Sequence, residues 1–238
     1  MNIYLADAAA QNLNDAADGL NIFLGADAPS PTTSTILYAS NEINRLNKDI
    51  RLRCLLSYHY YKKVDISKIF SPDIPQPLIM ADSGAFSALS LGVPIDIYDY
   101  ANWIKKWDKY FYKYPNLDVI GDPKKTLDNQ HLLEAEGLKP MPVFHVNEPW
   151  EYLEHYLDKY DYVALGGIVP YSQRLSILIP WLIKAFKMLP EGKKYHGFGV
   201  TGWKVLCSFP WDSVDSSSWA AGYRYGRIPL FSPVEGKI

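Results

Sequence analysis

Short apolar runs recur along the chain, and most are separated by enough residues to form a helix. Runs such as Leu78–Asp82 and Tyr162–Gly166 are apolar at nearly every position, as expected for strands that are covered on both faces. Runs of this kind predict eight strands. They are Asn2–Ala6, Arg53–Tyr58, Leu78–Asp82, Leu117–Asp122, Met141–Val146, Tyr162–Gly166, Tyr195–Val200 and Ser213–Ser216.

The segments between these runs predict helices, and the alternation of strand and helix predicts a parallel sheet in an α/β fold. An open, doubly wound sheet is the alternative, but its usual GxGxxG segment does not follow the first expected strand. We therefore expect residues 1–238 to form one domain, a single (β/α)8 TIM barrel. The expected helices are Thr35–Asn47, Asp96–Tyr112, Lys125–Glu136, Pro149–Lys159, Ser172–Met188 and Gly202–Phe209.

Composition narrows the partners that this barrel can have. The chain is 48% hydrophobic, which is enough for a full core, and its net charge of -2 provides no general attraction for a polyanion. Nucleic-acid binding would therefore need a local basic patch. Two cysteines, Cys54 and Cys207, cannot form a zinc site by themselves, and we expect no metal and no cofactor. No secretion signal or membrane-spanning run is evident, so we expect a cytoplasmic protein without membrane contacts.

Acidic residues lie where the expected strands end, and in a TIM barrel the carboxyl ends of the strands form the catalytic face. Asp82, Asp122 and Asp215 are three such residues, and His145 is a fourth polar candidate. Two carboxylates facing one pocket suit glycosyl chemistry, in which one attacks the anomeric carbon and the other transfers protons. The alternative for a single aspartate such as Asp122 is a helix N-cap.

Glycines and aromatic residues accompany these carboxylates. Glycines at strand ends allow the backbone to approach a ligand closely, although ordinary turn formation explains any single one equally well. A phenylalanine on each side of the pocket could stack on a flat heterocycle, although core packing is the usual role of this residue. The residues concerned are Gly84, Gly166, Gly167, Gly199, Phe86 and Phe198.

Four segments, taken in order, resemble the motifs of one family. Asp82–Phe86 is similar to a DSGGF/Y motif, Ala164–Ile168 to (A/V)xGGL, Gly197–Thr201 to MGVGT, and Asp212–Asp215 to DxFD. These motifs belong to the tRNA-guanine transglycosylases, and the chain resembles more closely their phage and bacterial relatives that insert 7-deazaguanines into DNA. The resemblance extends from about the third to the eighth expected strand.

The resemblance implies a base exchange without a cofactor. Asp215 would attack C1′ of a guanosine or deoxyguanosine, guanine would leave, and a 7-deazaguanine such as preQ0 or preQ1 would replace it, with Asp82 as general acid and base. His145 falls where the family usually has a glutamine. Asp118 could take the place of Asp122, because both lie on the same side of the expected strand. The implied substrate-binding residues are Ser83, Phe86, Asp122, His145, Gly166, Gly167, Ile168, Phe198 and Gly199.

One departure from the family bears on the substrate. The tRNA enzymes have a CxCxxC…H zinc subdomain after the nucleophile, and no such ligands follow Asp215 here. We therefore expect DNA as the substrate, contacted by Trp219, Arg224 and Arg227, with a homodimer or a partner subunit adding to the DNA-binding surface. The alternatives are the same exchange on tRNA, a catalytically silent barrel that binds nucleic acid or a partner, and a glycoside or nucleoside hydrolase.

Overall fold

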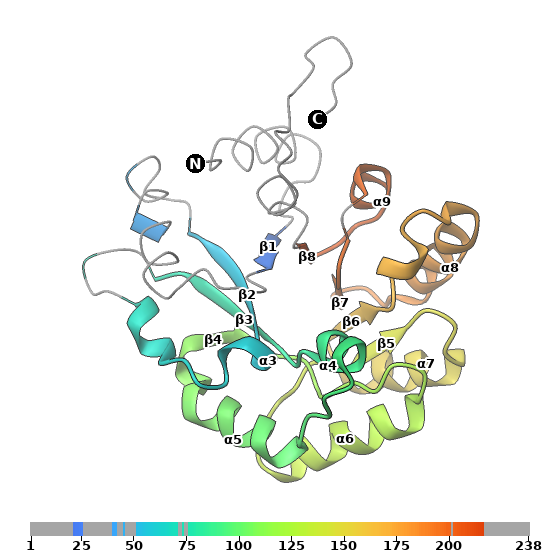
Figure 1. Cartoon of the computed structure of the whole chain (residues 1–238). Coiled ribbons are helices and arrows are strands. Elements are labelled where there is room, and N and C mark those ends of the chain that lie inside the picture. Colours follow the sequence, from blue (N-terminus) through green and yellow to red (C-terminus); the bar gives the residue numbers. More distant parts are fainter. Residues whose placement is uncertain are drawn as a thin grey trace.

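The computed structural model describes residues 21–25, 40–41, 45, 51–70, 73, 76–200 and 202–216. These residues contain an eight-stranded sheet whose paired strands are all parallel, in the order β4-β3-β2-β1-β8-β7-β6-β5. Figure 1 shows that helices flank the outside of this curved sheet. The fold is therefore α/β with a parallel sheet, as the alternation of patterns predicts. The strands are β1 (Asn21–Gly25), β2 (Arg53–Ser57), β3 (Leu78–Asp82), β4 (Phe111–Lys113), β5 (Val143–His145), β6 (Tyr162–Gly166), β7 (Lys194–Gly197) and β8 (Ser213–Ser216).

The α-helices follow the strands along most of the chain. Short helices begin directly after β2 and within three residues of the end of β3, and longer helices cover the outer face farther along the chain. Short 3-10 helices, η1 (Ile66–Ile69), η2 (Asp108–Tyr110) and η3 (Val169–Tyr171), complete three of the connections. The α-helices are α3 (Tyr58–Tyr61), α4 (Ala85–Leu91), α5 (Ile97–Trp107), α6 (Pro123–Ala135), α7 (Trp150–Lys159), α8 (Leu175–Met188) and α9 (Trp203–Ser208).

Side chains alternate between the two faces of the sheet, as a strand requires. On β3, Ile79 and Ala81 pack outward with residues of α5 such as Ile104, while Met80 belongs to an inner cluster with Leu55 and three other buried residues. Each fully buried aliphatic side chain of this kind stabilises the fold by about 1.5–3 kcal/mol. The same alternation places the last residue of β3, Asp82, on the inner face of the sheet.

The two end strands of the sheet approach each other without forming a ladder. One isolated parallel bridge joins Pro115, just after β4, to Met141, just before β5. Two backbone hydrogen bonds accompany it, from the Met141 N–H to the Tyr114 carbonyl at 2.8 Å and from the Asn116 N–H to the Met141 carbonyl at 2.9 Å. The strand ladder is thus open between β4 and β5.

Most of the predicted strands are confirmed. The predictions for β3, β6 and β8 match at both ends, β2 ends one residue earlier, and β5 and β7 are shorter than predicted. The predicted first strand, Asn2–Ala6, lies outside the described residues, and β1 was not predicted. Of the predicted helix Thr35–Asn47, the described residues 40, 41 and 45 are helical.

The predicted strand Leu117–Asp122 is wrong, and the fourth strand is Phe111–Lys113 instead. After Asn116 the backbone turns, because the Asp122 N–H donates to the Val119 carbonyl and the Val119 N–H donates to Thr126 Oγ1, both at 2.9 Å. These groups are therefore not available to a sheet. The predicted helix Asp96–Tyr112 included the first two residues of this strand, because Tyr112 and Lys113 are exposed polar positions that break the apolar pattern of a buried strand.

Candidate functional site

Three aspartates meet at the carboxyl ends of the strands. Asp82 is the last residue of β3, Asp215 lies in β8, and Asp118 lies in the loop after β4. Burial raises the pKa of Asp82 from 3.8 to about 7, and the negative charges of Asp118 and Asp215 contribute to this rise. The structure thus brings together Asp82 and Asp215, the two residues predicted to be catalytic, closely enough for their charges to interact.

The backbone after β3 holds the Asp82 carboxylate. Gly84 N–H donates to Asp82 Oδ2 at 2.9 Å. Gly84 has a left-handed φ of 77° and is the N-cap of α4, and a Cβ at this position would lie 2.7 Å from Ser57 Oγ. Only glycine fits this turn without strain.

Asp215 is held from two sides. Gly199 N–H donates to Asp215 Oδ1 at 2.9 Å, and His196 Nε2 lies 3.5 Å from the same oxygen. Behind it, His196 Nδ1 lies 2.6 Å from Ser213 Oγ, which in turn is hydrogen-bonded to the Tyr162 hydroxyl. His196 and Ser213 are fully buried, so this chain of polar groups lies inside the sheet and ends at the candidate nucleophile.

The third aspartate belongs to a second polar chain. Ser83 Oγ donates to Asp118 Oδ1 at 2.9 Å, and His145 Nε2 lies 2.9 Å from Asp118 Oδ2. The other ring nitrogen, His145 Nδ1, lies 2.8 Å from Glu148 Oε1. Burial alone would lower the pKa of His145, but hydrogen bonds and charges from Asp118 and Glu148 outweigh it and raise the pKa to about 10.

Asp122 lies apart from this group, contrary to its predicted place in the substrate pocket. It is exposed and caps α6, where its Oδ1 accepts a hydrogen bond from Lys125 N–H at 2.9 Å. The physical reason is local, because Asp-Pro at the start of a helix is a favourable N-cap followed by a favourable first residue. The aspartate that interacts with Asp82 is Asp118, the alternative that alternation along the chain left open.

The two phenylalanines differ in their surroundings. Phe86 lies in the first turn of α4 with 57% of its surface exposed. Phe198 follows β7, is partly buried against the inner cluster, and has its ring centroid 4.6 Å from that of His196. Phe198 therefore packs beside the residues that hold Asp215, while the ring of Phe86 is available at the surface.

The glycines at the end of β6 make room for His145. A Cβ on Gly166 would lie 2.8 Å from His145 Cδ2, and Gly167 has a left-handed φ of 68° with its Cβ position 3.3 Å from His145 Cβ. Gly199 is similarly constrained, since its φ is 66° and a Cβ would lie 2.4 Å from Val169 Cγ2. Ile168 is buried in a hydrophobic cluster that also contains Leu153 of α7 and Leu178 of α8.

Sequence reasoning missed Glu148 and His196. The spacing His145-x-x-Glu148 could have indicated a turn that brings the carboxylate back to the strand end. Alternation along β7 could have placed His196 on the inner face with Phe198. The predicted nucleic-acid contacts Trp219, Arg224 and Arg227 lie outside the described residues, so their roles stay predictions.

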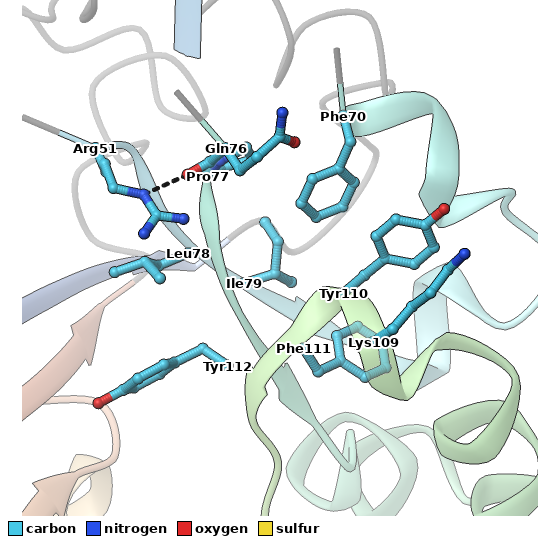
Figure 2. A pocket seen from close by; sticks show the side chains of 10 residues that line it. All are labelled: Arg51, Phe70, Gln76, Pro77, Leu78, Ile79, Lys109, Tyr110, Phe111 and Tyr112. Carbon is cyan, nitrogen blue, oxygen red and sulfur yellow. Dashed lines mark hydrogen bonds between the residues drawn. The ribbon is translucent and has the colours of Figure 1, made fainter. Parts of the chain in front are cut away.

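A cavity of about 420 Å³ lies at the other end of the sheet. Figure 2 shows its lining, in which Leu78 begins β3, Phe111 begins β4, and Arg51 Nε donates to the Gln76 carbonyl at 2.5 Å. Phe70 and Tyr110 stack on each other there, with centroids 4.6 Å apart. Because Asp82 is at the opposite end of β3, this cavity is separate from the aspartate group.

Two absences hold for the part of the chain that the structure describes. No group of three or more His, Cys, Asp or Glu side chains there is arranged to hold a metal ion. No helix there is long and apolar enough to cross a bilayer.

Comparisons with known proteins support the fold alone. No family model matches the chain, and no curated protein matches it. Among solved structures, a mutant tryptophan synthase α-subunit from Pyrococcus furiosus is similar over 89% of this chain and 93% of that one, with a TM-score of 0.52 and 13% identity. A protein described as a mandelate racemase from Bordetella bronchiseptica matches at a TM-score of 0.45 and 12% identity, over 81% of this chain and 45% of that one. The first match agrees with a TIM-barrel-like α/β fold.

Proposed function

We propose that the protein is an enzyme, a transglycosylase that exchanges guanine for a 7-deazaguanine base in DNA through a covalent Asp215 intermediate. The scaffold would be a single (β/α)8 barrel. The main support is the group of three interacting aspartates at the strand ends, in which the pKa of Asp82 is raised to about 7. A carboxyl group with a pKa near the working pH can both donate and accept a proton.

The exchange has two halves that use the same groups. In the first, Asp215 attacks C1′ of the target nucleoside, the C1′–N9 bond breaks, and Asp82 gives its proton to the departing guanine. In the second, Asp82 takes the N9 proton of the incoming 7-deazaguanine, N9 attacks C1′, and the bond between C1′ and Asp215 breaks. The strand is left intact and Asp82 is protonated again, so atoms and charges balance over the cycle.

Asp118, in place of Asp122, is the carboxylate that we assign to base recognition. Each of its oxygens already accepts one hydrogen bond, Oδ1 from Ser83 and Oδ2 from His145, and each has a lone pair left for an N–H of a guanine-type base. The backbone at Gly166, Gly167 and Ile168, with the rings of Phe86 and Phe198, would complete the base pocket.

DNA is the proposed polymer because the motifs of this chain resemble those of the relatives that modify DNA more closely than those of the tRNA enzymes. A target base has to leave the duplex stack to reach a site at the strand ends, which costs a few kcal/mol. Trp219, Arg224 and Arg227 would offset part of this cost by stacking and by contacts to phosphates. A second copy of the chain or a partner subunit would add positive surface to a chain whose net charge is -2.

The test is to incubate the protein with DNA or tRNA oligomers and preQ0, digest the products to nucleosides and measure their masses. We expect a deazaguanosine in DNA with the wild-type protein and none with Asp215→Ala. Omitting preQ0 should allow a covalent protein–DNA adduct to be detected by denaturing electrophoresis. Product in tRNA alone would transfer the proposal to tRNA, an abasic site would indicate a hydrolase, and no product in either polymer would refute the exchange.

A further inference from the structure

His145 has a carboxylate at each of its ring nitrogens. Asp118 Oδ2 lies 2.9 Å from Nε2, and Glu148 Oε1 lies 2.8 Å from Nδ1. The side chains of His145 and Glu148 are each 5% exposed, and that of Asp118 is 14% exposed. Because only the imidazolium has a hydrogen on both ring nitrogens, the ring satisfies both carboxylates only as a cation.

A tight turn returns Glu148 to the strand that it follows. Glu148 N–H donates to the His145 carbonyl at 3.2 Å, and Asn147 between them has a left-handed φ of 72°. Glu148 Oε2 then accepts from His145 N–H at 2.9 Å, so both carboxylate oxygens of Glu148 bind the same residue. Two contact points fix the plane of the imidazole ring as well as its position.

The neighbouring strand β6 is shaped around this ring. At Gly166, where β6 ends, a Cβ would come within 2.8 Å of His145 Cδ2 and 3.2 Å of Nε2. The charged and titratable groups beside the ring are Asp118 and Glu148. Asp82, Tyr100 and Tyr156 interact in turn with one or both of these carboxylates. In other proteins, replacing a buried ion pair by apolar residues of similar volume is often neutral or stabilising, so stability alone does not explain this buried ionic chain.

We propose that Glu148 and His145 are a positioning pair: Glu148 holds the imidazolium so that its Nε2–H, with the Ser83 hydroxyl, keeps the Asp118 carboxylate oriented toward N–H donors of the base. Because Nε2 is occupied by Asp118, His145 acts through Asp118 and does not contact the base with that nitrogen. This inference rests on the proposed function and adds to it a determinant of base specificity, Glu148.

The role predicts a specificity effect that a purely structural role would not produce. Guanine offers a ring N–H and an exocyclic amino group on one edge, and hypoxanthine lacks the amino group. A fixed Asp118 carboxylate discriminates between them because a buried acceptor without its donor is costly. When Asp118 is free to reorient, that discrimination falls.

The first experiment compares incorporation of radiolabelled guanine and hypoxanthine into DNA by wild type, Glu148→Gln and His145→Gln. Glu148→Gln keeps the shape and removes the charge, and His145→Gln keeps one N–H donor. We expect at least a tenfold fall in the guanine-to-hypoxanthine ratio of kcat/KM for both, with KM for guanine rising more than kcat falls. Glu151→Gln, which alters an exposed glutamate in the first turn of α7, should leave the ratio unchanged. An unchanged ratio in Glu148→Gln would overturn the proposal.

The second experiment does not depend on activity. The chain has five histidines, so ¹⁵N-histidine labelling gives a simple spectrum in which His145→Gln identifies the His145 signals. In the wild type both ring nitrogens of His145 should stay protonated above pH 8, and in Glu148→Gln the ring should lose its proton at lower pH. A wild-type His145 that titrates near pH 6.5 would overturn the positioning pair even in an active enzyme. If the wild type exchanges no base while His145 titrates as expected, the proposed function fails and the role of Asp118 in base recognition fails with it. The positioning of Asp118 by His145 and Glu148 would still hold.

Discussion

Replacing Asp82 with asparagine should stabilise the protein, and more so as the pH rises. The pKa of Asp82 is about 7 in the folded protein, against 3.8 for an ordinary aspartate, mainly because of burial. Between these values the folded state binds more protons than the unfolded state, so the ionisable carboxyl makes folding less favourable with increasing pH. About three pKa units correspond to a penalty of up to about 4 kcal/mol above pH 7, and of about 1–2 kcal/mol at pH 5. Asparagine avoids this penalty and keeps an oxygen for Gly84 N–H.

Urea unfolding of wild type and Asp82→Asn at pH 5 and pH 8 measures the effect directly. The gain in the free energy of unfolding should be larger at pH 8 by about 2 kcal/mol. Asp122→Asn is the matched control, since asparagine caps a helix about as well as aspartate and should change stability by less than about 1 kcal/mol at either pH. If Asp82→Asn is no more stable than wild type at pH 8, or gains equally at both pH values, the raised pKa is refuted and the acid–base role of Asp82 loses its basis.

Three further substitutions test other parts of the site. Gly199→Ala should lower the free energy of unfolding by about 1–3 kcal/mol and lower exchange activity at least tenfold, because it strains a left-handed residue and displaces the N–H that holds Asp215. Thermal unfolding and the exchange assay measure the two effects, and a fully active variant would contradict the second. His196→Ala should lower the free energy of unfolding by about 2–4 kcal/mol, because it leaves a buried cavity and breaks the series of polar contacts that leads to Asp215. A change below about 1 kcal/mol in urea unfolding would argue against a stabilising role for these contacts. Asp122→Ala should lower the free energy of unfolding by about 1 kcal/mol because a helix cap is lost, while the folded variant exchanges bases at the wild-type rate. A large fall in that rate would indicate that Asp122 does bind the substrate.

The alternation of apolar runs and helical segments determined most of the fold. The strands β3 and β6 were predicted with correct ends, because strands covered on both faces are nearly continuous apolar runs. The ends of β8 were also predicted correctly, although only Val214 of its four residues is apolar. The same regularity placed Asp82 and Asp215 at strand ends on one edge of the sheet, and the structure brings them close enough to interact. Local sequence is sufficient for these features because each depends on a period of two residues or on chain order.

Only the tertiary structure decided which polar residues act together. Asp118 and Asp122 are four residues apart and looked equivalent, but a turn stabilised by Thr126 places one beside Asp82 and leaves the other as the cap of α6. Glu148 was not predicted because its contact with His145 depends on a turn through the left-handed Asn147. It also depends on the space that Gly166 leaves for the His145 ring on the next strand. Hydrogen bonds between elements depend on distances across the sheet and on burial, and these quantities have no period along the chain.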